Sequence, residues 1–338
     1  MPMRRPALTA LVLPVLTIAV LAACGDTDTA DTADTSGGAV TATGAVSASD
    51  APDPSADAFP VTVASGDDEI TIDARPTAVV SLSPTATESL FAVGAGEQVV
   101  AVDDRSDFPA EAPVTELSGF EPNVEAVLGY SPDLVLASDG TNDLVAGLAA
   151  AGVPTLLLPA ATTLDEAYDQ IEVIGAATGN IGGAAEVVAG IQADIDEILA
   201  GLSPPDEPLT YYHELDPTYF SVTSATFIGD VYARLGLENV ADTATDPAAD
   251  PYPQLTEEFI VTADPDLIFL ADAQCCGVTP EQVAARPGWS GMTAVAEGRV
   301  HPVDEDVASR WGPRVVDFMT DVAEVVAEAE QPAEQPAG

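Results

Sequence analysis

The chain carries one short segment twice, and each copy holds a glutamate at the same place. NVEAVLGYSPDLVLASD occupies 123–139 and TEEFIVTADPDLIFLAD occupies 256–272, and an ungapped alignment puts Glu125 over Glu258. A cap-forming Asn or Thr precedes each glutamate by two positions. Both carboxylates are therefore expected in the first turn of equivalent helices, where the helix dipole favours an acid by about 0.3–1 kcal/mol. One exposed carboxylate per copy also suits docking on a partner with two matching basic sites.

A second set of side chains could contact a ligand, because aromatic rings and arginines gather on expected loops at strand ends. Its members are Arg105, Phe120, Tyr212, His213, Tyr219, Tyr252, Arg310 and Trp311. Aromatic faces with few polar groups suit a large, flat or apolar ligand that is stacked rather than caged. Each aromatic residue taken alone is more often part of a core. His213 has two interpretations, a ligand to iron or cobalt and a hydrogen-bonding residue at a strand end.

Two adjacent cysteines, Cys275 and Cys276, are the only ones after Cys24. They can form a vicinal disulfide, remain as two thiols or touch a ligand. No further ligands follow at zinc-site spacing, and with His213 and His301 as the only histidines the chain lacks the set that bare zinc or manganese requires. We therefore predict no protein-held metal and no cofactor.

The motifs of the common catalytic classes are missing from the sequence. It contains no GxSxG, no HExxH and no phosphate-binding loop. Gly94 and Gly96 follow an expected helix and precede an expected strand, which is the reverse of a dinucleotide-binding fingerprint. An enzyme is therefore not expected.

The elements that would position these side chains alternate between strand and helix. Short apolar runs predict strands at 78–82, 99–103, 134–137, 155–158, 209–215 and 299–304, and the second copy of the repeat predicts a helix and strand over 257–271. Helical patterns cover 83–93, 124–130, 143–151, 164–179, 184–202, 227–235, 280–286 and 313–328. Ser83 and Pro84 suit the start of the first helix, and Thr85 with Glu88 forms an alternative capping box.

This alternation predicts an α/β fold with parallel sheets covered by helices. We expect two Rossmann-like lobes, an N-terminal one at 60–179 and a C-terminal one at 205–329. A single long helix at 180–204 would join them, because its apolar stripe ends at the proline-rich SPPDEP. The ligand cleft is expected between the lobes.

Both ends of the chain are expected to lie outside the fold. Two arginines precede an apolar run that ends in LAAC, and 1–24 resembles a bacterial lipoprotein signal peptide in which Cys24 is lipidated. Small and acidic residues fill 25–59, which predicts a disordered tether, and 330–338 predicts a disordered tail. We therefore expect a protein held by its lipid in the bilayer at the extracytoplasmic face of the cell membrane.

The charge balance excludes some partners. Nine arginines, no lysine and 56 acidic residues give a formal net charge of −47. Such a chain repels nucleic acid and anionic lipid headgroups, so no nucleic-acid partner is expected. The acids are spread along the chain as a solvated surface, and a pair of carboxylates in it carries no enzymatic meaning.

Three segments resemble one known family. RPTAVVSLSPTATESLFAVGAGEQVVAVDDRSDFP (75–109), PNVEAVLGYSPDLVLAS (122–138) and PQLTEEFIVTADPDLIFLA (253–271) resemble the cobalamin and iron–siderophore binding proteins of ATP-driven importers. The resemblance covers about 75–328. It implies two rigid lobes joined by a long helix, with ligand in the cleft. It also implies that Glu125 and Glu258 meet arginines on an ABC permease, which works with its ATPase.

The resemblance frames the ligand as a small-molecule metal chelate or a corrinoid. A strongly anionic ferric catecholate would require more arginines than the cleft supplies, so we expect a neutral or cationic hydroxamate siderophore, or a corrinoid. The alternative ligand is haem or another metal chelate. The alternative function is that of a surface lipoprotein without a role in transport. Cys275 and Cys276 match nothing in the family pattern. The protein is expected to act as a monomer.

Overall fold

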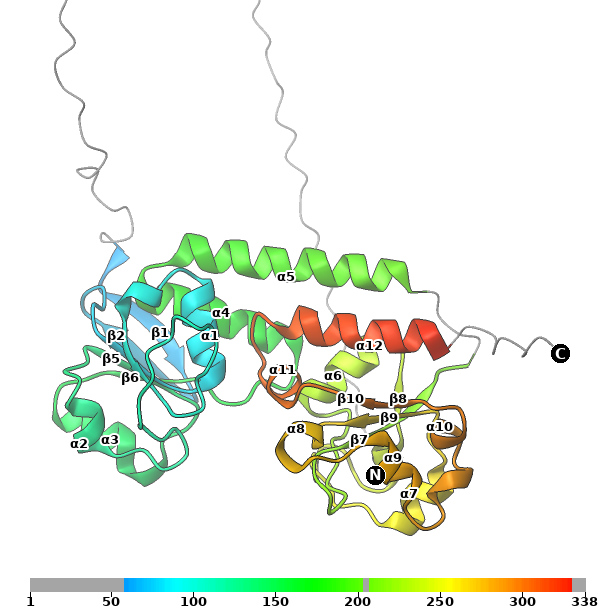
Figure 1. Ribbon diagram of the computed structural model, residues 1–338. Coiled ribbons are helices and arrows are strands. Elements are labelled where there is room, and N and C mark those ends of the chain that lie inside the picture. The colour runs from blue at the N-terminus through cyan, green and yellow to red at the C-terminus, as the bar shows by residue number, and fades with distance from the viewer. Residues whose placement is uncertain (1–57, 203–206, 330–338) are drawn as a thin grey trace, which may run out of the picture. The chain divides into compact units, whose positions relative to one another are not determined.

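The computed structural model describes residues 58–202 and 207–329, which form two α/β lobes (Figure 1). The predicted signal peptide with Cys24, nearly all of the tether, and the tail lie outside these residues. Within the described ranges no helix is both long enough and apolar enough to cross a membrane.

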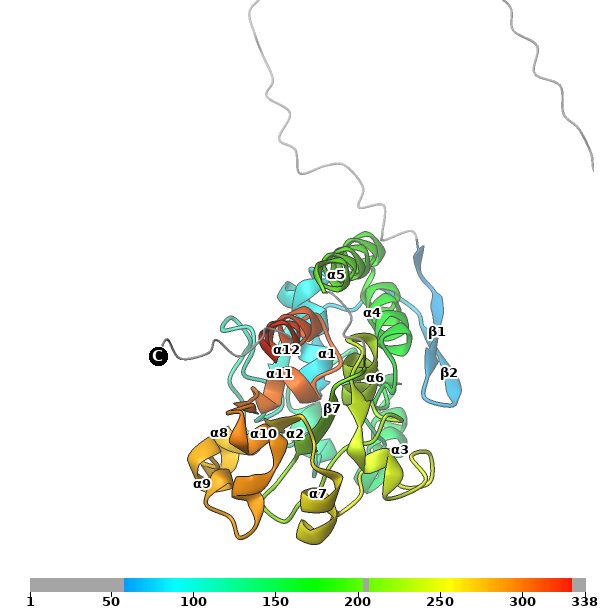
Figure 2. The same cartoon turned by 90° about the vertical axis from the view of Figure 1, so that its right-hand side faces the viewer.

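The N-terminal lobe is built on a four-stranded parallel sheet and a short hairpin. The sheet has the order β4-β3-β5-β6, with strands β3 (Val79–Leu82), β4 (Val99–Val102), β5 (Leu134–Ala137) and β6 (Thr155–Leu157). The antiparallel hairpin is β1 (Val61–Ser65) and β2 (Asp68–Ile72), and it lies beside α4 (Figure 2). The helical elements are α1 (Pro84–Ala92), η2 (Gly96–Gln98), α2 (Val124–Leu128), η3 (Thr141–Asp143), α3 (Leu144–Ala150) and α4 (Leu164–Thr178).

The C-terminal lobe repeats this plan. Its parallel sheet has the order β10-β9-β7-β8, with strands β7 (Thr210–Glu214), β8 (Glu238–Asn239), β9 (Leu267–Leu270) and β10 (Val300–Pro302). The helical elements are α6 (Phe227–Arg234), η4 (Val240–Thr243), α7 (Glu257–Ala263), α8 (Ala273–Cys276), α9 (Pro280–Ala284), η5 (Trp289–Gly291), α10 (Thr293–Ala296), α11 (Glu305–Ser309) and α12 (Val315–Ala329). In both lobes the strands lie in the spatial order second, first, third, fourth.

The repeated segment also repeats a side-chain clamp. Asp133 accepts hydrogen bonds from the backbone N–H and the hydroxyl of Thr77 at 2.8 and 2.9 Å, immediately before β3 and β5 pair. Asp266 accepts the same two bonds from Thr210 at 2.9 and 2.7 Å where β7 and β9 pair. Each aspartate therefore fixes the register at the start of a central strand pair.

The lobes are joined by α5 (Ile181–Gly201), which packs against α4 of one lobe and α12 of the other (Figures 1 and 2). One apolar cluster runs without a break through both lobes along these helices. It contains Ile171 of α4, Ile191 of α5, and Tyr232 and Phe318 of the C-terminal lobe. The lobes thus share a core, and the α/β class with two lobes and a long joining helix is confirmed.

Two parts of the fold differ from the sequence prediction. The hairpin at 61–72 was not predicted, although its alternation around Gly66 is a hairpin pattern. The stretch before Arg310 and Trp311 was expected to be part of a loop, yet it forms α11, because Asp304 caps that helix by accepting from the N–H groups of Asp306 and Val307. The first helix starts at Ser83 and Pro84 as predicted, and the alternative Thr85–Glu88 capping box does not form.

Candidate functional site

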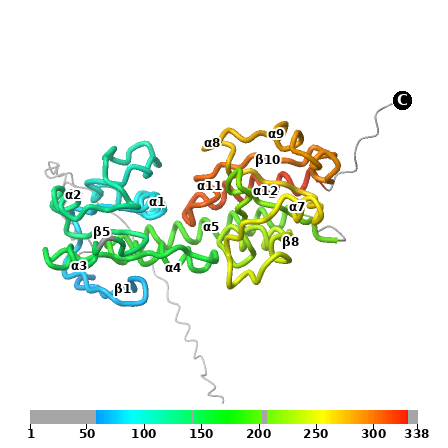
Figure 3. The backbone as a smooth tube through the Cα atoms, turned by 90° about the horizontal axis from the view of Figure 1, so that it is seen from below, coloured from blue at the N-terminus to red at the C-terminus, as the bar shows by residue number. Residues whose placement is uncertain are grey.

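The two repeated glutamates occupy matching helix starts. Asn123 accepts a hydrogen bond from the N–H of Ala126 at 2.9 Å, and Thr256 accepts one from the N–H of Phe259 at 3.2 Å. Glu125 and Glu258 lie in the first turns of α2 and α7, and both are exposed. The two helices lie in separate lobes, on the side away from α5 (Figures 1 and 3).

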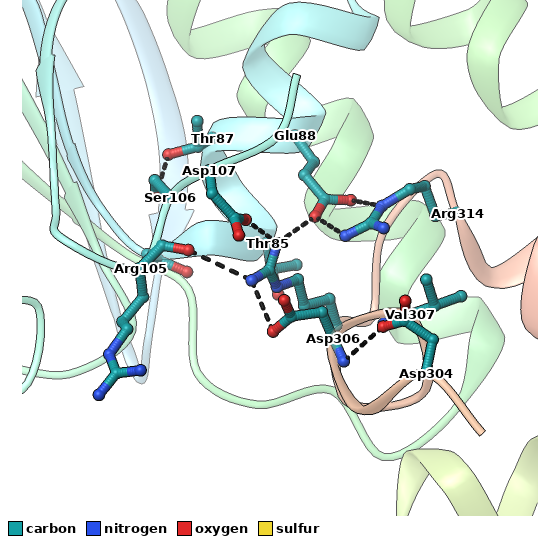
Figure 4. Close-up of polar contacts among 12 residues, drawn as sticks. Thr85, Thr87, Glu88, Arg105, Ser106, Asp107, Asp304, Asp306, Val307 and Arg314 are labelled. Atoms are coloured by element: carbon teal, nitrogen blue, oxygen red, sulfur yellow. Dashed lines mark hydrogen bonds and ion pairs between the residues drawn. The ribbon is translucent and has the colours of Figure 1, made fainter. Parts of the chain in front are cut away.

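A group of ion pairs ties the two lobes together. Glu88 of α1 accepts from Arg310 at 2.9 Å and from Arg314 at 2.9 and 2.6 Å (Figure 4). Arg310 also pairs with Asp107 of the N-terminal lobe at 3.0 Å and with Asp306 of α11 at 2.7 Å. We call these five residues the junction cluster.

The junction cluster buries its central carboxylate. The Glu88 side chain is 1% exposed, and that of Arg310 is 7% exposed. Burial acts to lower the pKa of Arg310, but the hydrogen bonds that Arg310 donates to Glu88 and Asp107 outweigh it and raise the pKa. A carboxylate this deeply buried is stable only while its cations are in place. The geometry of the lobe junction therefore depends on Glu88 and Arg310, which lie 222 positions apart.

The loop after β4 is held rigidly beside the junction cluster. Asp103 accepts from the N–H of Arg105 at 2.8 Å and from the hydroxyl of Ser106 at 2.9 Å, and Ser106 bonds Thr87 at 2.8 Å. Burial raises the pKa of Asp103 above its usual value, although the Arg105 N–H opposes that rise. Phe108 lies under the Arg314 guanidinium, 4.5 Å from ring centroid to guanidinium carbon.

The corresponding edge of the C-terminal lobe has its own buried ion pair. Glu214 at the end of β7 accepts both forks of Arg286, at 2.6 and 2.5 Å, and its side chain is 0% exposed. The Arg286 guanidinium lies 4.6 Å from the centroid of Trp289 and 5.4 Å from that of Tyr219. These two rings are stacked, with centroids 5.9 Å apart. Tyr219 adopts a positive φ of 69°, a sparsely populated conformation for a bulky residue.

A second acid lies next to Glu214 without a hydrogen-bond partner. Both carboxylate oxygens of Asp272 are buried and unpaired among the described residues. Burial, and then the nearby charge of Glu214, raise the pKa of Asp272 to about 7. The Asp272 carboxylate is therefore easier to protonate than that of an ordinary aspartate.

The cysteines beyond β9 are two free thiols, and both are exposed in α8. The vicinal disulfide is not formed in this structure. The Cys276 thiol, followed by burial and Glu305, raises the pKa of Cys275 to about 12.

Two of the predicted cleft residues belong to the core instead. Tyr212 and His213 are each 0% exposed on β7. Strands of a parallel sheet are buried on both faces, so consecutive side chains pack inward on opposite sides. The His213 Nδ1 bonds the Tyr232 hydroxyl at 2.9 Å, and burial lowers its pKa to about 3, which keeps the ring neutral. Neither residue can touch a ligand in this conformation.

The other predicted residues lie on loops at the carboxyl ends of the sheets or at the lobe junction. Phe120 is 88% exposed, Tyr252 is 49% exposed, and Arg105 is exposed. Trp311 is half-buried and donates its indole N–H to Gln170 of α4 at 3.0 Å. Arg310 is committed to the junction cluster.

Sequence reasoning missed four residues of this region, namely Glu88, Arg286, Trp289 and Arg314. Arg310 and Arg314 lie close together in the sequence, between α11 and α12. Glu88 is the single charged residue of its helix. The two arginines and the lone acid could each have been noticed in the sequence. No local pattern links Glu88 to Arg310, which lies 222 positions away.

A groove of about 480 Å³ lies elsewhere, between α5 and α12. It has Ile198 and Val316 among its apolar residues, with Glu197 and Glu324 also lining it. None of the predicted cleft residues lines this groove.

Comparison with known sequences defines the class. The model of the family described as periplasmic binding protein matches residues 79–307, and the chain belongs to that family. The uncharacterized ABC transporter substrate-binding lipoprotein YvrC of Bacillus subtilis is 33% identical over 79% of this chain and 86% of its own length. The cobalamin-binding protein of Halobacterium salinarum is 33% identical over 78% of this chain and 73% of its own length.

Solved structures agree on the fold. The periplasmic vitamin B12 binding protein BtuF of Vibrio cholerae aligns with a TM-score of 0.60 and 25% identity, covering 76% of this chain and 98% of that one. The periplasmic heme-binding protein RhuT of Roseiflexus aligns with a TM-score of 0.66 over 76% of this chain and 100% of that one. RhuT is 22% identical and supports the fold alone. The family is one of solute-binding transport proteins, with no catalytic family indicated.

Proposed function

We propose that this protein is the extracytoplasmic solute-binding lipoprotein of an ABC importer for a corrinoid or an iron chelate. The observation that carries the proposal is the pair of lobes with identical strand order, each presenting one exposed glutamate from a capped helix start. Names of relatives support the ligand class, since two sequences at 33% identity are a substrate-binding lipoprotein and a cobalamin-binding protein. The protein would act as a monomer and hand its ligand to a permease driven by an ATPase.

The docking part of the proposal assigns Glu125 and Glu258 to two basic sites on the permease. Both helices lie on the side of their lobes away from α5, so both carboxylates are available to one flat partner (Figure 1). Complementary charge sets register and association rate at such a surface. Arginine is the natural counterpart, because its guanidinium binds carboxylate in a bidentate fork.

Uptake measured in cells tests the docking assignment. The double change Glu125→Ala and Glu258→Ala is expected to reduce uptake at least tenfold while the purified protein keeps its ligand affinity. A matched control removes one exposed acid per lobe elsewhere, through Glu69→Ala and Glu238→Ala, and should leave uptake unchanged. Normal uptake by cells that carry the Glu125→Ala, Glu258→Ala variant would disprove the docking assignment.

The ligand part of the proposal places the chelate against the loops at the carboxyl ends of the two sheets. In open α/β sheets ligands bind beyond these strand ends. The exposed rings of Phe120 and Tyr252, together with the half-buried Tyr219, offer faces for stacking a planar body. Each stacked ring contributes on the order of 1 kcal/mol beyond the area it buries.

Isothermal titration of the purified protein separates the ligand classes. Cyanocobalamin, ferrichrome and haemin represent the corrinoid, the ferric hydroxamate and the haem alternatives. A dissociation constant near 1 μM, about 8 kcal/mol of binding, would assign the class. Absence of binding by all three would favour a surface lipoprotein without a transport role.

The membrane part of the proposal rests on Cys24. Its lipid would hold the protein at the outer face of the cell membrane. Cys24→Ser should release the protein from membranes into the medium, which cell fractionation measures. Retention of this variant in the membrane fraction would contradict the lipid anchor.

A further inference from the structure

Four arginines lie at the lobe junction or near the carboxyl edges of the sheets, and three of them are already neutralised by buried carboxylates. Arg310 and Arg314 bind Glu88, and Arg286 binds Glu214. The two glutamate side chains are 1% and 0% exposed, so withdrawing a guanidinium to bind a ligand would strand a buried charge. These three cations are structural and are not available to a ligand.

Arg105 is the exception. Its side chain is exposed, and among residues 58–202 and 207–329 no hydrogen bond or ion pair joins its guanidinium to the protein. Figure 4 shows this side chain directed away from the junction cluster, with no partner drawn at its guanidinium. It is the unpaired cation of this region in a chain of net charge −47.

The backbone of Arg105 is held although its side chain is free. Its N–H donates to the Asp103 carboxylate at 2.8 Å. Its carbonyl accepts from Arg310 of the other lobe at 3.2 Å. The Cα of Arg105 is therefore fixed at the point where the two lobes meet, and only the side-chain torsions remain to be ordered when a ligand binds. Such preorganisation lowers the entropic cost of a contact.

We propose that Arg105 binds a single localised oxyanion of the ligand, a phosphate diester or a carboxylate, and that it determines which chelates the protein accepts. A guanidinium recognises either group through two parallel N–H bonds. Asp104 and Asp107 flank Arg105 and are exposed. Asp107 pairs with Arg310, but Arg310 also pairs with Glu88 and Asp306, so the surroundings of Arg105 stay negatively charged. One guanidinium in that field compensates one anionic group, and a chelate with three negative charges is rejected.

The inference rests on the proposed function and sharpens it to a ligand chemistry. Both a corrinoid with its nucleotide phosphodiester and haem with its propionates carry the required group. Each has a counterpart that lacks it, dicyanocobinamide for cyanocobalamin and haem dimethyl ester for haemin. Comparing members of a pair isolates the oxyanion from the rest of the ligand.

The test is isothermal titration of wild type, Arg105→Ala and Arg105→Lys with both pairs and with ferric enterobactin. Arg105→Ala is expected to weaken binding of the oxyanion-bearing member at least tenfold, to leave its counterpart unchanged and to reduce the salt dependence of binding. Arg105→Lys should recover part of the loss. Arg299→Ala is the matched control, since Arg299 precedes β10 at the opposite edge of the sheet and should leave affinity unchanged.

The outcomes separate the two claims. Equal losses for both members of a pair, no loss at all, or tightest wild-type binding to ferric enterobactin would overturn the role of Arg105 while leaving a chelate-binding protein. Failure of the wild type to bind any of the five compounds would overturn the proposed function, and the role of Arg105 with it.

Discussion

The two lobes share a strand order and a Thr–Asp clamp, but they neutralise their buried glutamates differently. Glu214 of the C-terminal lobe is matched by Arg286 of the same lobe. Glu88 of the N-terminal lobe is matched by Arg310 and Arg314, both from the other lobe. One lobe therefore satisfies its internal charge alone, and the other does so only when the two are docked. The two lobes therefore repeat a strand order but not the ion pairs, and the ion pairs make the contact between them asymmetric.

Removing both cations from Glu88 should have the largest effect. Arg310→Ala with Arg314→Ala leaves a carboxylate that is 1% exposed without compensation. The free energy of unfolding should fall by about 3–5 kcal/mol, measured by urea denaturation. Adding Glu88→Gln to this double variant removes the stranded charge and should restore part of the loss. A loss below about 1 kcal/mol would show that water reaches Glu88.

The matching change in the other lobe should cost less. Arg286→Ala strands Glu214, but Asp272 lies beside it and the two acids can share a proton. We expect a loss of about 2–3 kcal/mol on the same urea scale. Hydrogen exchange sharpens the comparison, because this variant should expose amides of the C-terminal lobe only. The double variant Arg310→Ala with Arg314→Ala should instead expose amides in both lobes. Identical exchange patterns for this variant and for Arg286→Ala would contradict the asymmetry.

Asp272 should make the stability of the C-terminal lobe depend on pH. Its folded pKa of about 7 lies above the ordinary value of 3.8, so between these values the folded state holds a proton that the unfolded chain has released. Stability is thus greatest at low pH and is lost as pH rises through about 7. Asp272→Asn should remove this loss and raise stability at pH 8 by about 1–2 kcal/mol. Melting curves from pH 5 to 8 measure it, and a parallel dependence in both proteins would refute the assignment.

The clamps should show where the lobes remain equivalent. Thr77→Val and Thr210→Val each remove one hydroxyl bond to an aspartate, at 2.9 and 2.7 Å. Each change should lower the free energy of unfolding by about 1 kcal/mol, and the two values should agree within about 0.5 kcal/mol. Clearly unequal losses in the free energy of unfolding, from matched denaturation curves, would mean that the clamp stabilises one lobe only.

Local features of this fold could be predicted from the sequence, and pairings over long distances could not. Capping residues such as Ser83 and Asn123, the apolar stripe of α5 and the repeated segment all carry their information within a few residues. The junction cluster joins Glu88 to residues 222 and 226 positions away, which no local pattern encodes. The sequence also allowed Glu88 to close a capping box with Thr85. In the structure Glu88 accepts from Arg310 and Arg314 instead.

The candidate site was predicted in part for a related reason. Placement of Glu125 and Glu258 followed from caps and helix turns. Tyr212 and His213 were expected at the lobe-facing end of a strand, within reach of a ligand, but both lie inside β7 and are buried. The fold accommodates them through the Tyr232 hydroxyl and the Glu214 carboxylate.

The apolar cluster shared by α4, α5 and α12 has a consequence for how the chain is made. Synthesis begins at the N-terminus, yet α12 ends at Ala329 and supplies Phe318, Met319 and Val322 to the core. α12 packs against α5 and α6, so the flank of the joining helix that it covers stays exposed until residues 315–329 have been made. We expect a chain truncated before α12 to leave this apolar surface uncovered and to become a substrate for chaperones and proteases.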